Sequence, residues 1–338
     1  MMLALWIVLL IVGFALLVKG ADWFVDGAAG IAGKCKISPL VIGLTVVAFG
    51  TSAPELAVSV VSAARHSTDL AIGNVLGSNI TNVLLILGFS ALIHKLPVQK
   101  NSRRLDLPVL LLASALIIGL GVWGRALSWW DGLILLGVFS VYMVFLFRGA
   151  LKEQRERKLL GLPPESEQEE KKEPKTKLGK WLAKMSEKTW FLIILTAVGL
   201  GMVVGGGTLL VEAAKKIAEY FHVPERIVGL TIVALGTSLP ELVTSIVAAK
   251  KGETDIAVGN IIGSNIFNIF IVAGISSLVS PLVFSIEANL IDALVALAAA
   301  LLLCLLACFD AHRIGRVGGV VMLLGFIAYY VYLFLIPA

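Results

Sequence analysis

Two glutamates stand inside long apolar stretches of the chain, and each belongs to a nearly identical hexapeptide. Residues 50–55 read GTSAPE and residues 236–241 read GTSLPE, so Glu55 and Glu241 lie 186 residues apart at equivalent places. A carboxylate inside a membrane-length apolar segment is costly, and by default it marks a functional site. The repetition predicts that the two carboxylates meet and that a cation binds between them.

Further oxygen atoms accompany each carboxylate. Thr51, Ser52 and Glu55 are spaced i, i+1 and i+4, which places them near one face of a helix. Pro54 has no N–H group, so the carbonyl of Gly50 loses its helical partner, and we expect a bend or break there. The second hexapeptide repeats the arrangement with Thr237, Ser238, Pro240 and Glu241.

The apolar stretch after each hexapeptide carries a polar stripe on one face of a predicted continuous helix. The first stripe is Asn74, Ser78 and Asn82, and the second has the same spacing with Asn260, Ser264 and Asn268. We interpret Asn82 and Asn268, which we expect nearer the membrane midplane, as ligands. Packing and interhelical hydrogen bonds are the expected role of Asn74, Asn79, Asn260 and Asn265.

The chemistry of this predicted ligand set favours hard cations. All of its atoms are oxygens, which suit Ca²⁺ and Na⁺, whereas Zn²⁺ or Cu⁺ prefers nitrogen or sulfur. Two carboxylates match the charge of one divalent ion, and monovalent ions could compete for the same oxygens. The alternative, a structural salt bridge from each glutamate to Lys or Arg, finds no basic residue within either apolar span.

Composition indicates a polytopic membrane protein. Of 338 residues, 58% are hydrophobic and only 15% are charged, against about 25% charged in soluble domains. The net charge of +5 comes from basic residues in loops, so it does not indicate nucleic acid binding. We expect a transporter, not an enzyme, with no cofactor. Ten apolar runs are predicted to cross the bilayer, at 3–20, 38–64, 69–92, 106–123, 129–148, 189–220, 227–249, 255–278, 287–309 and 316–336.

The chain is an internal duplication. Residues 43–82 align without a gap on residues 229–268, with 24 of 40 positions identical. Copies displaced by five spans enter the membrane from opposite sides, so the predicted fold is all-α, with two inverted five-helix repeats. The expected organisation is a first half at 1–148 (repeat about 38–92), a linker at 149–188, and a second half at 189–338 (repeat about 227–278).

Alternate loops differ in basic content. One set of loops is rich in lysine and arginine and includes the charged linker as well as Lys34, Lys36, Lys250 and Lys251. The other set has few basic residues, such as Arg65. The rich set is expected to be cytoplasmic, which places both termini outside. Residues 1–18 are interpreted as the first transmembrane helix and not as a cleaved signal. We expect the cell (plasma or inner) membrane as the location and a monomer as the working unit.

These motifs resemble the two alpha-repeats of the cation/calcium exchanger superfamily, particularly its prokaryotic sodium/calcium antiporter branch, over essentially the whole chain. The resemblance implies exchange of Ca²⁺ for Na⁺ by alternating access, with the first and sixth spans sliding against the other eight. It also implies that the carbonyls of Ala48 and Ala234 and the hydroxyls of Ser78 and Ser264 are ligands. Some relatives carry Asp at one of the positions of Asn82 and Asn268. Asn at both argues against potassium dependence.

Two other functions remain open from the sequence. In a Ca²⁺/H⁺ antiporter the two glutamates would carry protons, although the neighbouring hydroxyls and carbonyls suit Na⁺ better. In a cation channel the glutamates would form a filter, but filters are typically built on the axis of an oligomer, whereas this repeat lies within one chain.

Overall fold

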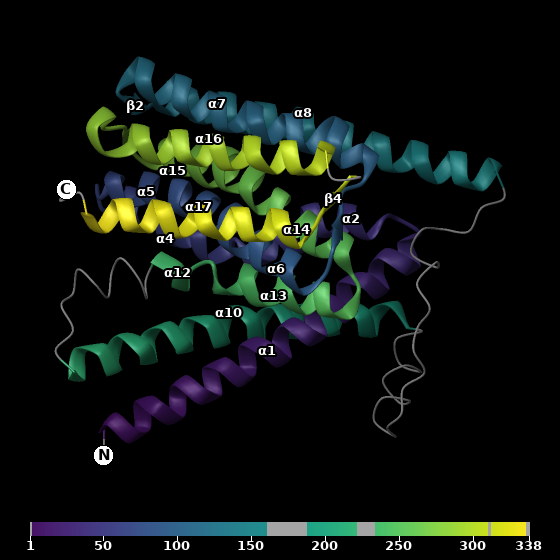
Figure 1. Ribbon diagram of the computed structural model, residues 1–338, viewed down its shortest axis with the longest axis horizontal. Helices are drawn as coiled ribbons and strands as arrows, with labels where there is room; N and C mark the ends of the chain where they lie inside the picture. Colours follow the sequence, from purple (N-terminus) through teal and green to yellow (C-terminus); the bar gives the residue numbers. More distant parts are fainter. Residues whose placement is uncertain (1, 161–187, 222–233, 310–311, 336–338) are drawn as a thin grey trace.

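The protein is a bundle of long helices (Figure 1). The computed structural model describes residues 2–160, 188–221, 234–309 and 312–335. The first half contains α1 (Met2–Cys35), α2 (Pro39–Ile42), α3 (Ala48–Thr51), α4 (Ala53–Ala64), α5 (Thr68–Ile80), α6 (Gly88–Ile93), α7 (Leu107–Gly124) and α8 (Trp129–Leu159). The second half contains α10 (Thr189–Tyr220), α12 (Ala234–Gly236), α13 (Leu239–Lys251), α14 (Thr254–Phe267), α15 (Gly274–Val279), α16 (Ile286–Phe309) and α17 (Arg316–Leu335). Within the described residues, π-helical turns occupy Gly43–Val47, Thr81–Leu87, Ser102–Asp106 and Asn268–Ala273.

The helix lengths agree with a polytopic membrane protein. Eight helices in the described part of the chain are long and apolar enough to cross a membrane, and a bent pair, Pro39–Thr51 with Ala53–Ala64, makes a ninth. The predicted span 227–249 begins among residues that the structure does not describe, so the count of ten is not tested. Most of the predicted linker, 149–188, also lies outside the described residues, although α8 extends into it as far as Leu159.

The first helix is longer than its predicted span of 3–20. It continues to Cys35, past a group of charged residues that would end an isolated apolar segment. Lys19 donates to Asp22 at 2.5 Å one turn along the helix, and its ammonium lies 5.7 Å from the ring of Trp23. The apolar run therefore predicted the membrane-length part of α1 but not its extension.

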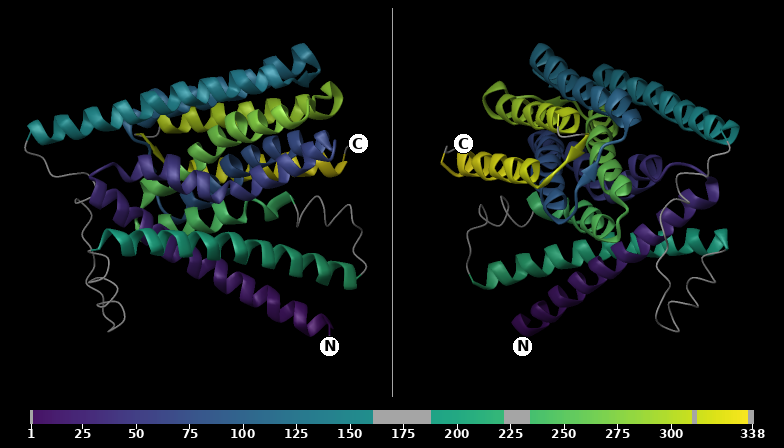
Figure 2. Two further views of the ribbon diagram at one scale, coloured as in Figure 1. Left: turned by 180° about the vertical axis from the view of Figure 1, so that it is seen from behind. Right: turned by 45° about the vertical axis from the view of Figure 1, so that its right-hand side comes forward.

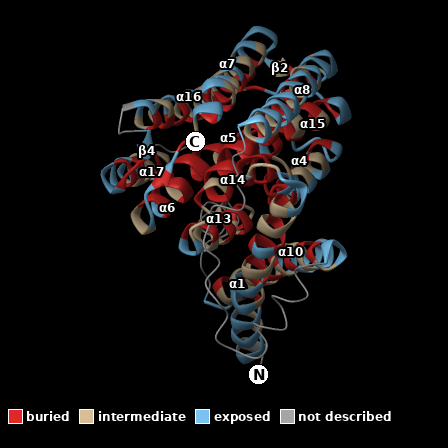
Figure 3. Cartoon of the chain, turned by 90° about the vertical axis from the view of Figure 1, so that its right-hand side faces the viewer, coloured by how far each residue is buried: buried red, intermediate tan, exposed pale blue. Residues whose placement is uncertain are grey.

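Two runs of helix form the centre of the molecule. In the run Thr254–Val279, 94% of the residues in the apolar 18-residue stretch are buried. The corresponding share is 72% in Thr68–Ile93 and 17–39% in the other candidate spans. Figure 3 shows this difference, with buried residues gathered on α5 and α14 and exposed residues on α8 and α16. Both central runs carry one of the predicted polar stripes, so the stripes lie in the interior.

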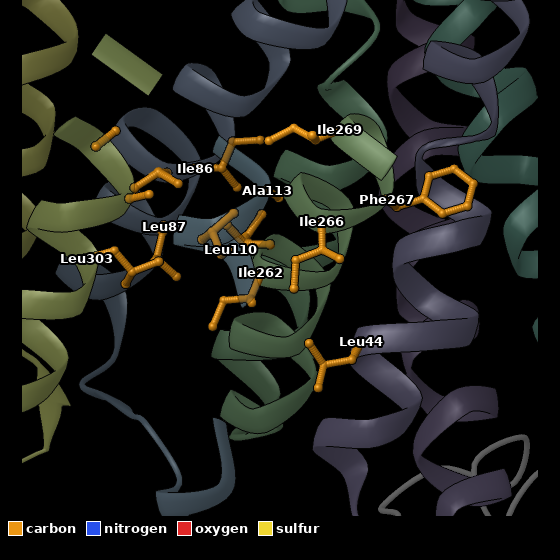
Figure 4. Close-up of a cluster of buried hydrophobic side chains, with 14 of the residues drawn as sticks. Leu44, Ile86, Leu87, Leu110, Ala113, Ile262, Ile266, Phe267, Ile269 and Leu303 are labelled. Atoms are coloured by element: carbon orange, nitrogen blue, oxygen red, sulfur yellow. The ribbon is translucent and has the colours of Figure 1, made fainter. Parts of the chain in front are cut away.

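Apolar side chains from both halves pack around these central runs. Figure 4 shows Ile86 and Leu87 from the first half beside Ile262 and Ile266 of α14, with Leu303 of α16 at the edge of the cluster. All five are buried. The two halves therefore share one hydrophobic core.

Helices α1 and α10 lie side by side at one edge of the bundle in both Figure 1 and Figure 2. They cross where glycines allow backbone contact. A Cβ on Gly206 would lie 2.8 Å from the carbonyl oxygen of Gly13, and one on Gly20 would lie 2.9 Å from that of Gly199. Since Gly13 and Gly199 are 186 residues apart, as are Gly20 and Gly206, the crossing has the symmetry of the sequence repeat.

Two short strand pairs join the halves in the same symmetric way. The strand β1 (Leu96–Pro97) pairs antiparallel with β4 (Arg313–Ile314), and β2 (Ala126–Leu127) pairs antiparallel with β3 (Leu282–Val283). Each pair takes one strand from each half.

Gly206→Ala is expected to destabilise the protein, because its Cβ would lie 2.6 Å from the backbone nitrogen of Leu17 and such overpacking costs about 1–3 kcal/mol. Gly201→Ala is the matched control on the same helix, since a Cβ there meets nothing within 4 Å. Thermal unfolding of the purified variants in detergent measures the effect. Equal melting temperatures for the two variants would contradict the packing argument.

Candidate cation site

The two hexapeptides bend the helices that contain them. Between α3 and α4 the chain turns at Ser52, with φ −85° and ψ 7°, and between α12 and α13 Ser238 has φ −88° and ψ 6°. The first of these bends measures 46°, as the missing N–H group of Pro54 predicts. The hydroxyl and carboxylate groups at both breaks lie in the interior of the bundle.

Hydrogen bonds between the halves join the two breaks. Ser52 Oγ donates to Glu241 Oε1 at 2.9 Å, and Ser238 Oγ donates to Glu55 Oε1 at 3.3 Å. Both glutamates are completely buried, and each accepts a bond from the hexapeptide of the other half. The predicted meeting of the two hexapeptides is therefore confirmed.

Neither glutamate forms an ion pair with any lysine or arginine in the described part of the chain. The salt-bridge alternative considered from the sequence therefore gains no support. A buried carboxylate without a counter-charge is strongly unfavourable, so a cation would stabilise this arrangement.

Four asparagines on the central runs form a symmetric network, the amide quartet of Asn79, Asn82, Asn265 and Asn268. Asn79 Nδ2 donates to the carbonyl of Asn265 at 3.2 Å, and Asn265 Nδ2 returns a bond of 3.2 Å to the carbonyl of Asn79. Asn82 Nδ2 donates to Asn265 Oδ1 at 2.9 Å, and Asn268 Nδ2 donates to Asn79 Oδ1 at 3.2 Å.

The amide quartet fixes the orientation of the two predicted ligands. Because the amide nitrogens of Asn82 and Asn268 are held by Asn265 and Asn79, their Oδ1 atoms remain as acceptors. Both Oδ1 atoms are buried and unpartnered within the described residues. The interhelical bonds expected of Asn79 and Asn265 are confirmed, but their second role, aiming Asn82 and Asn268, could not be read from spacing alone.

The other two asparagines support the broken helices. Asn74 Nδ2 donates to Ser59 Oγ, and Asn260 Nδ2 donates to Ser245 Oγ, both at 2.9 Å. Asn260 Oδ1 also accepts from the hydroxyl of Thr51 at 3.0 Å. The two serines were missed in the sequence, although they too are identical residues 186 positions apart.

The helices that carry the stripes are continuous over Thr68–Ile93 and Thr254–Val279, as predicted, but each contains a π-helical turn. The π-helical turn Thr81–Leu87 includes Asn82, and Asn268 begins the π-helical turn Asn268–Ala273. Such turns widen the helix locally and are frequent at functional sites. They occur at equivalent places in both halves, and side-chain periodicity does not distinguish a π-helical turn from an α-helix.

Six unpartnered oxygens of the predicted ligand set form what we call the oxygen cluster. Among buried side-chain atoms of the described residues, ten have no hydrogen-bond partner, and six of these ten are Glu55 Oε2, Asn82 Oδ1, Thr237 Oγ1, Glu241 Oε2, Ser264 Oγ and Asn268 Oδ1. Buried polar atoms are normally satisfied, so each exception needs an explanation. Two carboxylate, two hydroxyl and two amide oxygens fit a hard cation such as Ca²⁺, which takes 6–8 oxygens.

Ser78, Ala48 and Ala234 are also predicted ligands, but none of them contributes an atom to the oxygen cluster. Ser78 Oγ lies 3.5 Å from Ser238 Oγ, whose hydrogen is donated to Glu55. The carbonyl of Ala48 already accepts from the Ser52 N–H at 3.0 Å. Ala234 begins α12, and only its backbone is described. Ligand roles for these three, as for every other residue of the predicted ligand set, stay predictions.

Known proteins of one family match this chain over nearly its whole length. The family described as sodium/calcium exchanger protein matches residues 5–148 and 191–335. The sodium/calcium exchanger MaX1 of Methanosarcina acetivorans is 34% identical over 351 residues, covering 97% of this chain and 98% of that protein. The inner membrane protein YrbG of Escherichia coli is 36% identical over 323 residues, covering 95% and 94%.

Solved structures of the sodium-calcium exchanger NCX_Mj have a similar fold. One of them, soaked with zero Na⁺ and Ca²⁺, superimposes with a TM-score of 0.81 at 33% identity, and the match covers 98% of this chain and 99% of that chain.

Asn265→Ala is expected to lower stability more than Asn74→Ala. The first change leaves the amide of Asn82 without its acceptor and the carbonyl of Asn79 without the bond from Asn265 Nδ2, at a cost of about 1–3 kcal/mol for each buried group left unpaired. Asn74 is only partly buried and bonds within its own half, which makes its variant the milder control. Denaturation of the ion-free proteins compares them, and a larger loss for Asn74→Ala would refute the assigned roles.

Proposed function

The chain belongs to the sodium/calcium exchanger family, and we propose that it exchanges Ca²⁺ for Na⁺ by alternating access to a midplane site formed by Glu55 and Glu241. The observation that carries this proposal is the pair of crossed Ser–Glu hydrogen bonds, which brings one carboxylate from each half into a shared buried space. The four amide and hydroxyl oxygens of the oxygen cluster supply neutral ligands for the same ion.

Charge balance favours a divalent cargo. Glu55 and Glu241 together carry two negative charges, and the neutral amides at Asn82 and Asn268 add none. One Ca²⁺ therefore neutralises the pair, and Na⁺ ions can replace it on the same oxygens. Because an unneutralised pair is strongly unfavourable, release of one kind of ion is coupled to binding of the other.

We further propose that the transport unit is ten spans in two inverted five-helix repeats. Support comes from the separate family matches of the two halves and from the symmetric contacts of the glycine crossing, the strand pairs and the amide quartet. In secondary transporters built from inverted repeats, the substrate site lies where the repeats meet. The proposed repeats are those at about 38–92 and 227–278.

The proposed orientation places the 149–188 linker in the cytoplasm and both termini outside, in the plasma or inner membrane. Lys34, Lys250 and Lys251 then lie at the cytoplasmic end, in accordance with the distribution of basic residues in membrane proteins. One chain contributes both carboxylates, so we propose that the monomer is sufficient for exchange.

An outward-directed Na⁺ gradient is expected to drive ⁴⁵Ca²⁺ uptake into proteoliposomes that contain the purified protein, because Na⁺ leaving the site allows Ca²⁺ to enter it. Vesicles without the gradient are the control. Uptake driven only by a pH gradient in Na⁺-free buffer would instead establish Ca²⁺/H⁺ exchange. Flux that continues without any counter-ion would establish a channel.

Glu55→Gln and Glu241→Gln are each expected to abolish Ca²⁺ exchange, because a single carboxylate leaves one charge of the divalent ion unbalanced in a buried site. Asp106→Asn is the matched control. Asp106 is another buried carboxyl group in a candidate span, but it accepts a bond from the hydroxyl of Tyr142 at 3.0 Å and lies outside the ligand set. Near-normal ⁴⁵Ca²⁺ exchange by either glutamine variant would refute the two-glutamate site.

A further inference from the structure

Lys251, the last residue of α13, directs its ammonium group to α1. Its Nζ atom lies 2.6 Å from Asp22 Oδ1 and 2.6 Å from Asp26 Oδ1, and it donates to the carbonyl oxygen of Asp22 at 2.7 Å. An ammonium group has three N–H donors, so α1 supplies an acceptor for each of them. The Lys251 side chain is 25% exposed, so solvent and salt screen this contact less than a fully exposed pair.

This contact joins α1 to the helix that carries one of the site glutamates. Helix α13 has Glu241 in its first turn and Lys251 at its end. Helix α1 packs along α13, whereas α10 has no comparable packing against α4 among the described residues. The helix pair α1 and α10 is therefore docked on the second-half site helix and not on its first-half equivalent.

The sequence repeat places residues of the same charges at the equivalent interface, which lies between α10 and α4. Lys251 corresponds to Arg65, which directly follows α4, and Asp26 corresponds to Glu212 on α10, since both pairs of positions are 186 apart. Arg65 and Glu212 are both exposed and both described, yet no ion pair joins them. The described structure therefore contains the contact of Lys251 with α1, but not the equivalent contact of Arg65 with Glu212.

We propose that Lys251 is a positioning residue for transport, which holds α1 against α13 and so closes the site at the end where Lys251 lies. In the opposite-facing state Arg65 contacts Glu212 and holds α10 against α4. This inference rests on the proposed alternating access, because only exchange of the conformations of the two halves converts the first contact into the second.

The two contacts are unequal. Helix α1 offers two carboxylates to Lys251, but the position equivalent to Asp22 on α10 is Thr208, so Arg65 finds only Glu212. The Lys251 contact is therefore the stronger one, and the state with α1 docked is favoured. A difference of one ion pair changes such an equilibrium by about two- to fivefold.

Distance measurements between spin labels on α1 and α13 test the proposal without any transport. One label is placed on Cys35, which is exposed at the end of α1, and the other on Lys250→Cys, with Cys304 and Cys308 replaced by serine. In nanodiscs, Lys251→Gln is expected to raise the ratio of undocked to docked α1 by about two- to fivefold. Adding Arg65→Gln to that variant is expected to bring the ratio back toward the unsubstituted value.

Lys100→Gln, which removes another exposed lysine, is the matched control and is expected to leave the ratio unchanged. The double exchange Lys251→Asp with Asp26→Lys is expected to restore docking. An unchanged ratio in Lys251→Gln, or a further rise when Arg65→Gln is added, would overturn the proposal. Absence of Na⁺-driven ⁴⁵Ca²⁺ uptake by the unsubstituted protein, alongside the expected distance changes, would count against the proposed function instead.

Discussion

The repulsion between two buried carboxylates is the constraint on which the rest of the structure depends. Glu55 and Glu241 face each other without a basic partner in the described residues, and each uses only one oxygen for a serine of the opposite half. The neighbouring groups are all neutral, so they can solvate a cation but cannot replace it. Cations that bind between the carboxylates therefore stabilise the site, and one kind of cation can replace another there.

The central runs and the pair α1 and α10 are held by different interactions. The central runs are tied by the reciprocal bonds between Asn79 and Asn265 and are the most buried of the candidate spans. The pair α1 and α10 lies at the edge and meets through close backbone contacts at glycines. Displacement of this pair would therefore disturb the amide quartet little, while changing which end of the site is covered.

Much of this arrangement follows from the sequence, because the repeat carries the information twice. The duplicated hexapeptide predicted the meeting of Glu55 and Glu241, and Pro54 predicted the bend. The π-helical turns were not predictable, since they change backbone bonding without changing the side-chain pattern. The contact of Lys251 with Asp26 joins positions 225 residues apart, and helix packing, not local spacing, brings them together.

The amide quartet is self-complementary. Asn79 makes the same bonds to Asn265 that Asn265 makes to Asn79, and Asn82 and Asn268 are exchanged by the same operation. A half-length chain with only the first repeat would therefore find every partner for its two asparagines in a second copy of itself, across an isologous interface. The contact that now joins the two halves is one that two identical chains, inserted in opposite directions, could have formed before their genes were fused.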